Sequence, residues 1–154
     1  MNSELVVLAT NLGLGEPQSR ELALKFSLAC AKRIEHLLED SEVVQCLHVL
    51  EHYVAGRASQ EMLLLAQQDA ARLANQHRGS RSIDGCGHAA VSASYGVAKA
   101  VAGRAVDAAQ YCAYAAVYAS GGYAAVADRQ AFEPEFAWQL QCLRGMAPVN
   151  LVNR

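Results

Sequence analysis

The fold is decided by the stretch CGHAAVSASYGVAKAVAGRAVDAAQYCAYAAVYASGGYAAVA (residues 86–127), of which more than half is Ala, Gly or Ser. Small residues allow helix backbones to approach at the short end of the usual range of about 8–10 Å. A membrane span needs roughly 20 strongly apolar residues, whereas this stretch is interrupted by Lys99, Arg104, Asp107 and Gln110. The stretch therefore predicts two closely packed helices, over about residues 85–102 and 104–120, with Gly103 at the bend.

The rest of the chain also has helical periodicity, and no segment alternates as a strand would. Capping signals lie near Asp40–Ser41 and at Ser59, and Gly56 and Gly79 mark helix ends. We expect further helices over residues 19–40, 42–56, 60–77 and 133–143. The predicted fold is a single all-α domain over residues 1–154, a compact bundle of five or six helices, with an N-terminal extension over 1–16 and an irregular tail over 145–154.

Composition excludes several classes of protein. The net charge is -2 and no dense Lys/Arg stripe occurs, so nothing in the sequence favours nucleic acid as a partner. The five Cys residues are odd in number and never form a C-x-x-C pair, which is typical of reduced thiols in a cytosolic protein. The first residues lack the basic and apolar regions of a signal peptide. We therefore expect a cytoplasmic protein with no membrane partner.

Each of the two Ala-rich helices is predicted to carry a stripe of polar and aromatic residues, because a helix turns by about 100° per residue. The stripe of the first helix consists of His88, Ser92, Tyr95 and Lys99. The stripe of the second helix consists of Arg104, Asp107, Tyr111, Tyr114 and Tyr118. Such stripes are either solvated faces, a recognition surface for a protein partner, or the lining of a small-molecule pocket or buried polar network. Exposed Tyr and Arg are typical anchors of binding surfaces.

Two short motifs bear on enzymatic function. Tyr95 and Lys99 match the Y-x-x-x-K of short-chain dehydrogenases, but the strand and Gly-rich turn that such chemistry needs are missing from the pattern. His48, Glu51 and His52 spell H-x-x-E-H, a zinc-binding motif. These three residues lie opposite the apolar stripe of their helix and lack a nearby third ligand. The sequence therefore predicts no catalytic residue, metal or cofactor.

An ordered series of features resembles a known family. It comprises LALKFSLACAKRIEHLLE (22–39), HVLEHYVAGRAS (48–59), Gly87-His88-Ala89, CAYAAVYA (112–119) and a closing E-x-x-W-Q segment from Glu135 to Gln139. Over about residues 20–145 the chain resembles the bacterial immunity proteins of polymorphic toxin systems, in the group called immunity-protein-five-like. The resemblance implies a small helical cytoplasmic protein that binds and blocks a cognate protein toxin. Gly87, His88, Trp138 and the region of Tyr114 match family positions, and no catalytic residue carries over.

Two functions remain as expectations. The first is a non-enzymatic protein-binding module, an immunity protein that neutralises a toxin through the two stripes. The alternative is a small-molecule-binding helical bundle or minor enzyme that uses the face of His88, Ser92, Tyr95 and Lys99. A protein binder should expose its tyrosines, whereas a ligand site should converge on a concave pocket. The sequence leaves a homo-oligomer open.

Overall fold

The computed structural model describes residues 1–77 and 86–152, and these residues are all-α with no strand. The predicted fold class is therefore confirmed, although the helices are slightly more numerous than the five or six expected. The described helices are α1 (Ser3–Asn11), α2 (Arg20–Arg33), α3 (Ser41–Val54), α4 (Gln60–Gln76), α5 (Cys86–Val101), α6 (Ala105–Gly121), α7 (Glu133–Met146) and the short α8 (Val149–Val152). Single turns of 3-10 helix are η1 (Pro17–Ser19), η2 (Glu35–Leu37), η3 (Tyr123–Ala127) and η4 (Arg129–Phe132).

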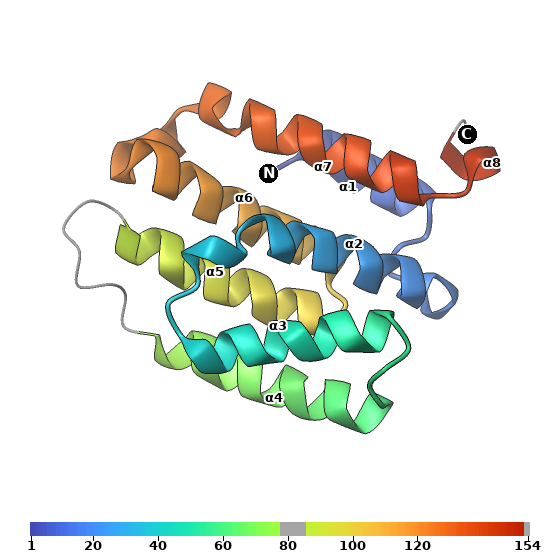
Figure 1. Cartoon of the computed structure of the whole chain (residues 1–154). Coiled ribbons are helices and arrows are strands. Elements are labelled where there is room, and N and C mark those ends of the chain that lie inside the picture. The colour runs from blue at the N-terminus through green and yellow to red at the C-terminus, as the bar shows by residue number, and fades with distance from the viewer. Residues whose placement is uncertain (78–85, 153–154) are drawn as a thin grey trace.

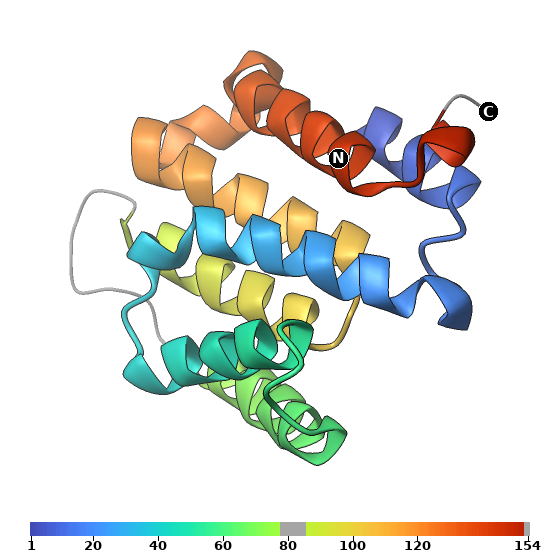
Figure 2. The same cartoon turned by 45° about the vertical axis from the view of Figure 1, so that its right-hand side comes forward.

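The Ala-rich helices α5 and α6 lie in the middle of the bundle. Helix α5 packs against α2, α3, α4 and α6, while α6 packs against α1, α2, α5 and α7. Figures 1 and 2 show the α3–α4 hairpin on one side of this central pair and α1 with α7 on the other. In the described parts of the chain, no helix combines the length and apolar character required to cross a membrane.

Small residues allow the close approach of α5 and α6 that the sequence predicts. Ala93, Ala109 and Ala113 are fully or almost fully buried. At Gly96 a Cβ atom would lie only 2.8 Å from Sγ of Cys112, so even an alanine would force a shift. Gly103, with a φ of 75°, makes the predicted bend between the two helices.

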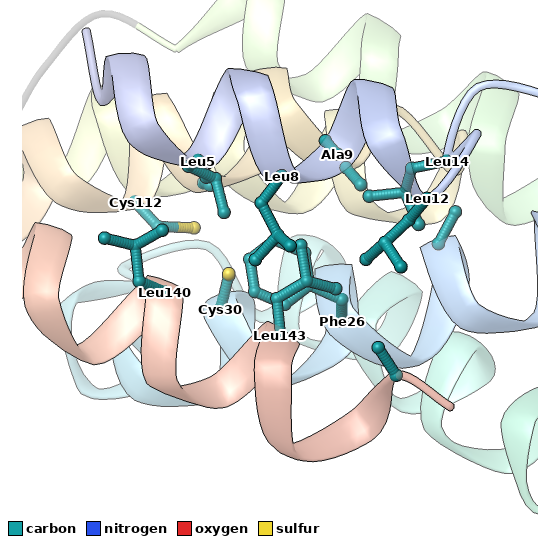
Figure 3. Packing of buried hydrophobic residues seen from close by; sticks show 14 of the residues in the cluster. Leu5, Leu8, Ala9, Leu12, Leu14, Phe26, Cys30, Cys112, Leu140 and Leu143 are labelled. Atoms are coloured by element: carbon teal, nitrogen blue, oxygen red, sulfur yellow. The ribbon is translucent and has the colours of Figure 1, made fainter. Parts of the chain in front are cut away.

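Large side chains from the surrounding helices supply most of the apolar volume of the core. One cluster joins α1, α2, α6 and α7 around Phe26 and Leu143, and Figure 3 shows leucines of α1 packing onto it. A second cluster joins α2, α3, α4 and α5 around Leu47, Leu50 and Leu63. Burying side chains of this size contributes about 1.5–3 kcal/mol each. The alanines thus allow α5 and α6 to approach closely, and the leucines provide most of the hydrophobic stabilisation.

The sequence predicts that residues 1–16 form an extension outside the bundle, whereas in the structure they are part of it. They contain α1, whose Leu5 and Leu8 are buried in the first cluster together with Leu12 and Leu14. Asn2 caps this helix by accepting a hydrogen bond from Leu5 N at 3.2 Å. Its side chain also donates to Oε1 of Gln139, whose Nε2 donates to the carbonyl of Ala109 at 2.8 Å. This buried polar chain fixes α1 to α7 and α6.

The other predicted boundaries are largely as expected. Oδ1 of Asp40 accepts from Glu42 N at 2.8 Å and Oγ of Ser59 accepts from Met62 N at 3.2 Å, so both predicted caps are present. Helix α2 ends earlier than predicted, at Arg33, because Ile34 leaves the helical conformation and is buried. The tail expected to be irregular over 145–154 includes the end of α7 and α8. The predicted stop at Gly79 lies outside the described residues.

Candidate functional site

The two stripes predicted on the Ala-rich helices meet in the structure. The rings of Tyr95 and Tyr111 stack with centroids 5.3 Å apart, and the rings of His88 and Tyr118 stack at 5.2 Å. Because both pairs join α5 to α6, the stripes form one continuous surface. We call it the tyrosine face. It consists of His88, Ser92, Tyr95 and Lys99 of α5, the N-cap residue Arg104 of α6, and Asp107, Tyr111, Tyr114 and Tyr118 of α6.

The tyrosine face is neither core nor freely solvated. His88 and Arg104 are exposed, and the other seven residues of the face are half-buried. The four tyrosines of the face each have at least one ring neighbour, so their side chains are held in place by aromatic contacts. A purely solvated face would not need such contacts. The surface is therefore a pre-formed aromatic surface with exposed polar residues at its ends.

Polar contacts fix the edges of the face. The hydroxyl of Tyr95 donates to Oδ1 of Asn75 on α4 at 2.9 Å, which links the face to a third helix. Nη2 of Arg104 lies 2.7 Å from Oδ2 of Asp107, one turn along α6. Burial and the neighbouring hydroxyls of Tyr123 and Tyr114 raise the pKa of Tyr118, so its phenol stays protonated and can donate or accept a hydrogen bond.

Three aromatic residues that the sequence analysis did not single out also belong to this region. Tyr123 is exposed and its ring lies 4.9 Å from that of His88. Phe132 meets Tyr114 edge-on at 5.1 Å and Phe136 packs on Phe132 at 5.4 Å. They follow a turn at Gly122, where a φ of 74° redirects the chain so that η3 packs back on α6. Helical spacing cannot reveal residues that return to a helix through such a turn.

A cleft of about 760 Å³ adjoins the tyrosine face. It lies between the N-terminal end of α1, α6, η4 and α7, and Tyr114, Phe132 and Phe136 give it aromatic walls. Charged side chains of both signs also line it, namely Glu4, Arg129 and Glu133. Tyr114 belongs both to the face and to the cleft. His88, Ser92, Tyr95 and Lys99 do not line the cleft.

The H-x-x-E-H motif takes part in a cluster of surface ion pairs. Nε2 of His48 lies 3.5 Å from Oε1 of Glu35, and Nζ of Lys32 lies 2.6 Å from Glu35 and 3.1 Å from Glu51. The residues that the structure describes contain no group of three or more His, Cys, Asp or Glu side chains placed to hold a metal ion. Glu51 is thus engaged by a lysine rather than aimed at a shared centre with both histidines.

The buried thiols are poorly suited to nucleophilic chemistry. Desolvation raises the pKa of Cys30 well above its ordinary value, and burial acts in the same direction on Cys112. Both sulfurs lie inside the first core cluster, as Figure 3 shows. At neutral pH these residues are therefore protonated and act as small apolar side chains.

The tyrosine face and its cleft thus adjoin at Tyr114 and form one candidate surface. Comparison of the chain with protein-family models, with curated proteins and with solved structures found no match.

Proposed function

We propose that this protein is a non-enzymatic, cytoplasmic binding module that neutralises a cognate bacterial toxin, with the tyrosine face as its contact surface. The observation that carries the proposal is the joining of the α5 and α6 stripes into one surface through the stacked pairs Tyr95–Tyr111 and His88–Tyr118. The partner follows from the resemblance to the immunity proteins of toxin systems.

The physical argument for protein binding rests on residue type and on order. Tyr and Arg are over-represented among the residues that dominate the energy of protein interfaces. Tyrosines that are already held by ring contacts lose little side-chain entropy when a partner binds. The exposed Arg104 and His88 lie at opposite ends of the face and add polar contacts that fix the orientation of a partner.

A second candidate function is favoured by the cleft beside Tyr114. Its volume of about 760 Å³ lies within the range of ligand pockets, about 300–1,000 Å³. A flat aromatic ligand with a polar substituent would match walls made by Phe132 and Phe136 and the nearby Arg129. The alternative of a small-molecule site therefore centres on this cleft rather than on His88, Ser92, Tyr95 and Lys99.

The test first asks whether a toxin gene lies immediately upstream of the gene for this protein. It then co-expresses the two products and measures both growth rescue and the Kd of the purified pair. Tyr118→Ala should weaken binding at least about thirtyfold, which corresponds to about 2 kcal/mol. Tyr118→Phe keeps the ring that stacks on His88 and removes only the hydroxyl. Tyr53→Ala on α3 is the matched control, because Tyr53 is also half-buried but lies outside the face.

The outcomes separate the two candidates. Loss of affinity in Tyr118→Ala with an unchanged Kd in Tyr53→Ala supports the tyrosine face. Unchanged affinity in a folded Tyr118→Ala variant overturns it. A rise in melting temperature on adding small aromatic carboxylates, abolished by Arg129→Ala, would instead favour the ligand cleft.

A further inference from the structure

The outer side of the α3–α4 hairpin carries exposed apolar side chains. Leu65 is 62% exposed and Met62, almost one turn earlier on α4, is 47% exposed. The inner side of the same hairpin buries Leu47, Leu50 and Leu63 in the second core cluster. Helix α4 is thus apolar on two sides, and only one of them is needed for the core.

Nothing in the described parts of the chain covers this outer side. Helix α4 packs against α3 and α5, and α3 packs against α2, α4 and α5. Figures 1 and 2 show the hairpin at the edge of the bundle in both views. The exposed side chains of α4 therefore face away from the rest of the fold.

The exposed residues line a groove between α3 and α4. Its volume is about 330 Å³, and its apolar wall is formed by Cys46, Val49, Met62, Leu65, Ala66 and Leu73. On α4 the contributing positions recur at three- and four-residue spacing from Met62 to Leu73. A groove between two antiparallel helices with such a lining has the shape that an amphipathic helix fills.

One end of the groove is acidic. Glu42 and Asp69 line it, and the guanidinium of Arg72 lies 3.9 Å from the first carboxylate and 3.7 Å from the second. Desolvation, followed by the negative charges of Asp69, Asp40 and Glu42, raises the pKa of the neighbouring Cys46 to about 11. Within the described residues, two carboxylates thus share the charge of one guanidinium, so the sum of these three charges is negative.

We propose that this groove is a second binding surface, which takes an amphipathic helix of a partner protein. Leu or Met side chains of that helix would pack on Val49, Met62 and Leu65, and a Lys or Arg beyond them would meet Glu42 and Asp69. A second copy of this chain that packed through the same groove fits less well, because it would add the same two carboxylates while its Arg72 is already engaged. The proposal does not depend on the tyrosine face.

The probe is a pair of synthetic helical peptides of about 18 residues with Leu at i, i+3, i+4 and i+7. One peptide carries Arg about one turn beyond each end of these anchors, and the other carries Glu there. Fluorescence anisotropy at low salt should show that the Arg peptide binds at least about tenfold more tightly. The difference should shrink as salt is raised, because the carboxylates are exposed.

Variants of the groove distinguish its two parts. Leu65→Ser should abolish binding of both peptides, whereas Val7→Ser on α1, where Val7 is 59% exposed, should leave it unchanged. The double variant Glu42→Gln/Asp69→Asn should reduce the preference for the Arg peptide to less than about threefold. Tyr118→Phe should not affect either peptide, so failure of this proposal is separate from failure of the proposed function.

Three results would overturn the proposal. They are equal affinity for the two peptides, binding that survives Leu65→Ser, and sedimentation that shows the protein alone to be a dimer that Leu65→Ser dissociates. The last result would identify a second copy of this chain as the occupant.

Discussion

The α3–α4 and α5–α6 hairpins bury side chains of different size, and they occupy different positions in the bundle. The α3–α4 hairpin lies at the edge, has neighbours mainly on one side and buries Val43, Leu47 and Leu63. The α5–α6 hairpin is surrounded by other helices and buries Ala93, Ala109 and Ala113. A helix with one packed side accommodates large side chains there, whereas a helix with neighbours on several sides needs small ones. Removing side-chain volume should therefore destabilise mainly the α3–α4 hairpin, whereas adding volume should destabilise mainly the α5–α6 hairpin.

The largest expected effect is the removal of volume from the α3–α4 hairpin. Leu63 is completely buried, so Leu63→Ala should lower the free energy of unfolding by about 2–5 kcal/mol, through lost burial and the cavity left behind. Its neighbour Leu64 is 47% exposed, and Leu64→Ala should change the stability by less than about 0.5 kcal/mol. Urea unfolding of both variants measures the difference, and equal losses would contradict the assigned inner and outer sides of α4.

Adding volume to the α5–α6 hairpin should have the next largest effect. Ala109 and Ala113 are buried on α6, so Ala109→Leu and Ala113→Leu should overpack their contacts and cost about 1–3 kcal/mol. Ala119 is exposed on the same helix, and Ala119→Leu provides the matched control with little expected change. If both buried variants melt at the temperature of the control, the buried side of α6 has been assigned wrongly.

The smallest effect concerns the surface ion pairs that link α3 to the end of α2. The hydrogen bond from Lys32 lowers the pKa of Glu35 below its ordinary value of 4.5. This stabilisation is therefore present above pH 4.5 and is lost as the pH falls through the lowered pKa. Because both side chains are substantially solvated, the loss should be no more than about 0.5 kcal/mol.

Glu35→Gln tests this interpretation. The variant should lose slightly less stability than the original protein between about pH 7 and pH 3, since it has no carboxylate at this position to protonate. If the two proteins differed by several kcal/mol in this loss of unfolding free energy, the stability of the α3–α4 edge would depend on charge rather than on buried leucines.

Much of the candidate surface could be predicted from the sequence. The positions of the stripes on α5 and α6 followed from helical spacing, and the bend at Gly103 implied that the two helices are neighbours. The contribution of Tyr123, Phe132 and Phe136 could not be predicted, because the turn at Gly122 decides where the following chain lies. The exposed side of α4 was equally hidden, since Leu63, Leu64 and Leu65 are consecutive and chemically alike.

The sequence by itself determined the all-α class, the caps at Asp40 and Ser59, and the use of small residues where helices approach closely. These features depend on interactions within a few residues along the chain. Only the tertiary structure decided that α1 belongs to the core, that the two stripes form one face and that Met62 and Leu65 stay uncovered. Each of these depends on which distant helix packs against which side, and local periodicity does not carry that information.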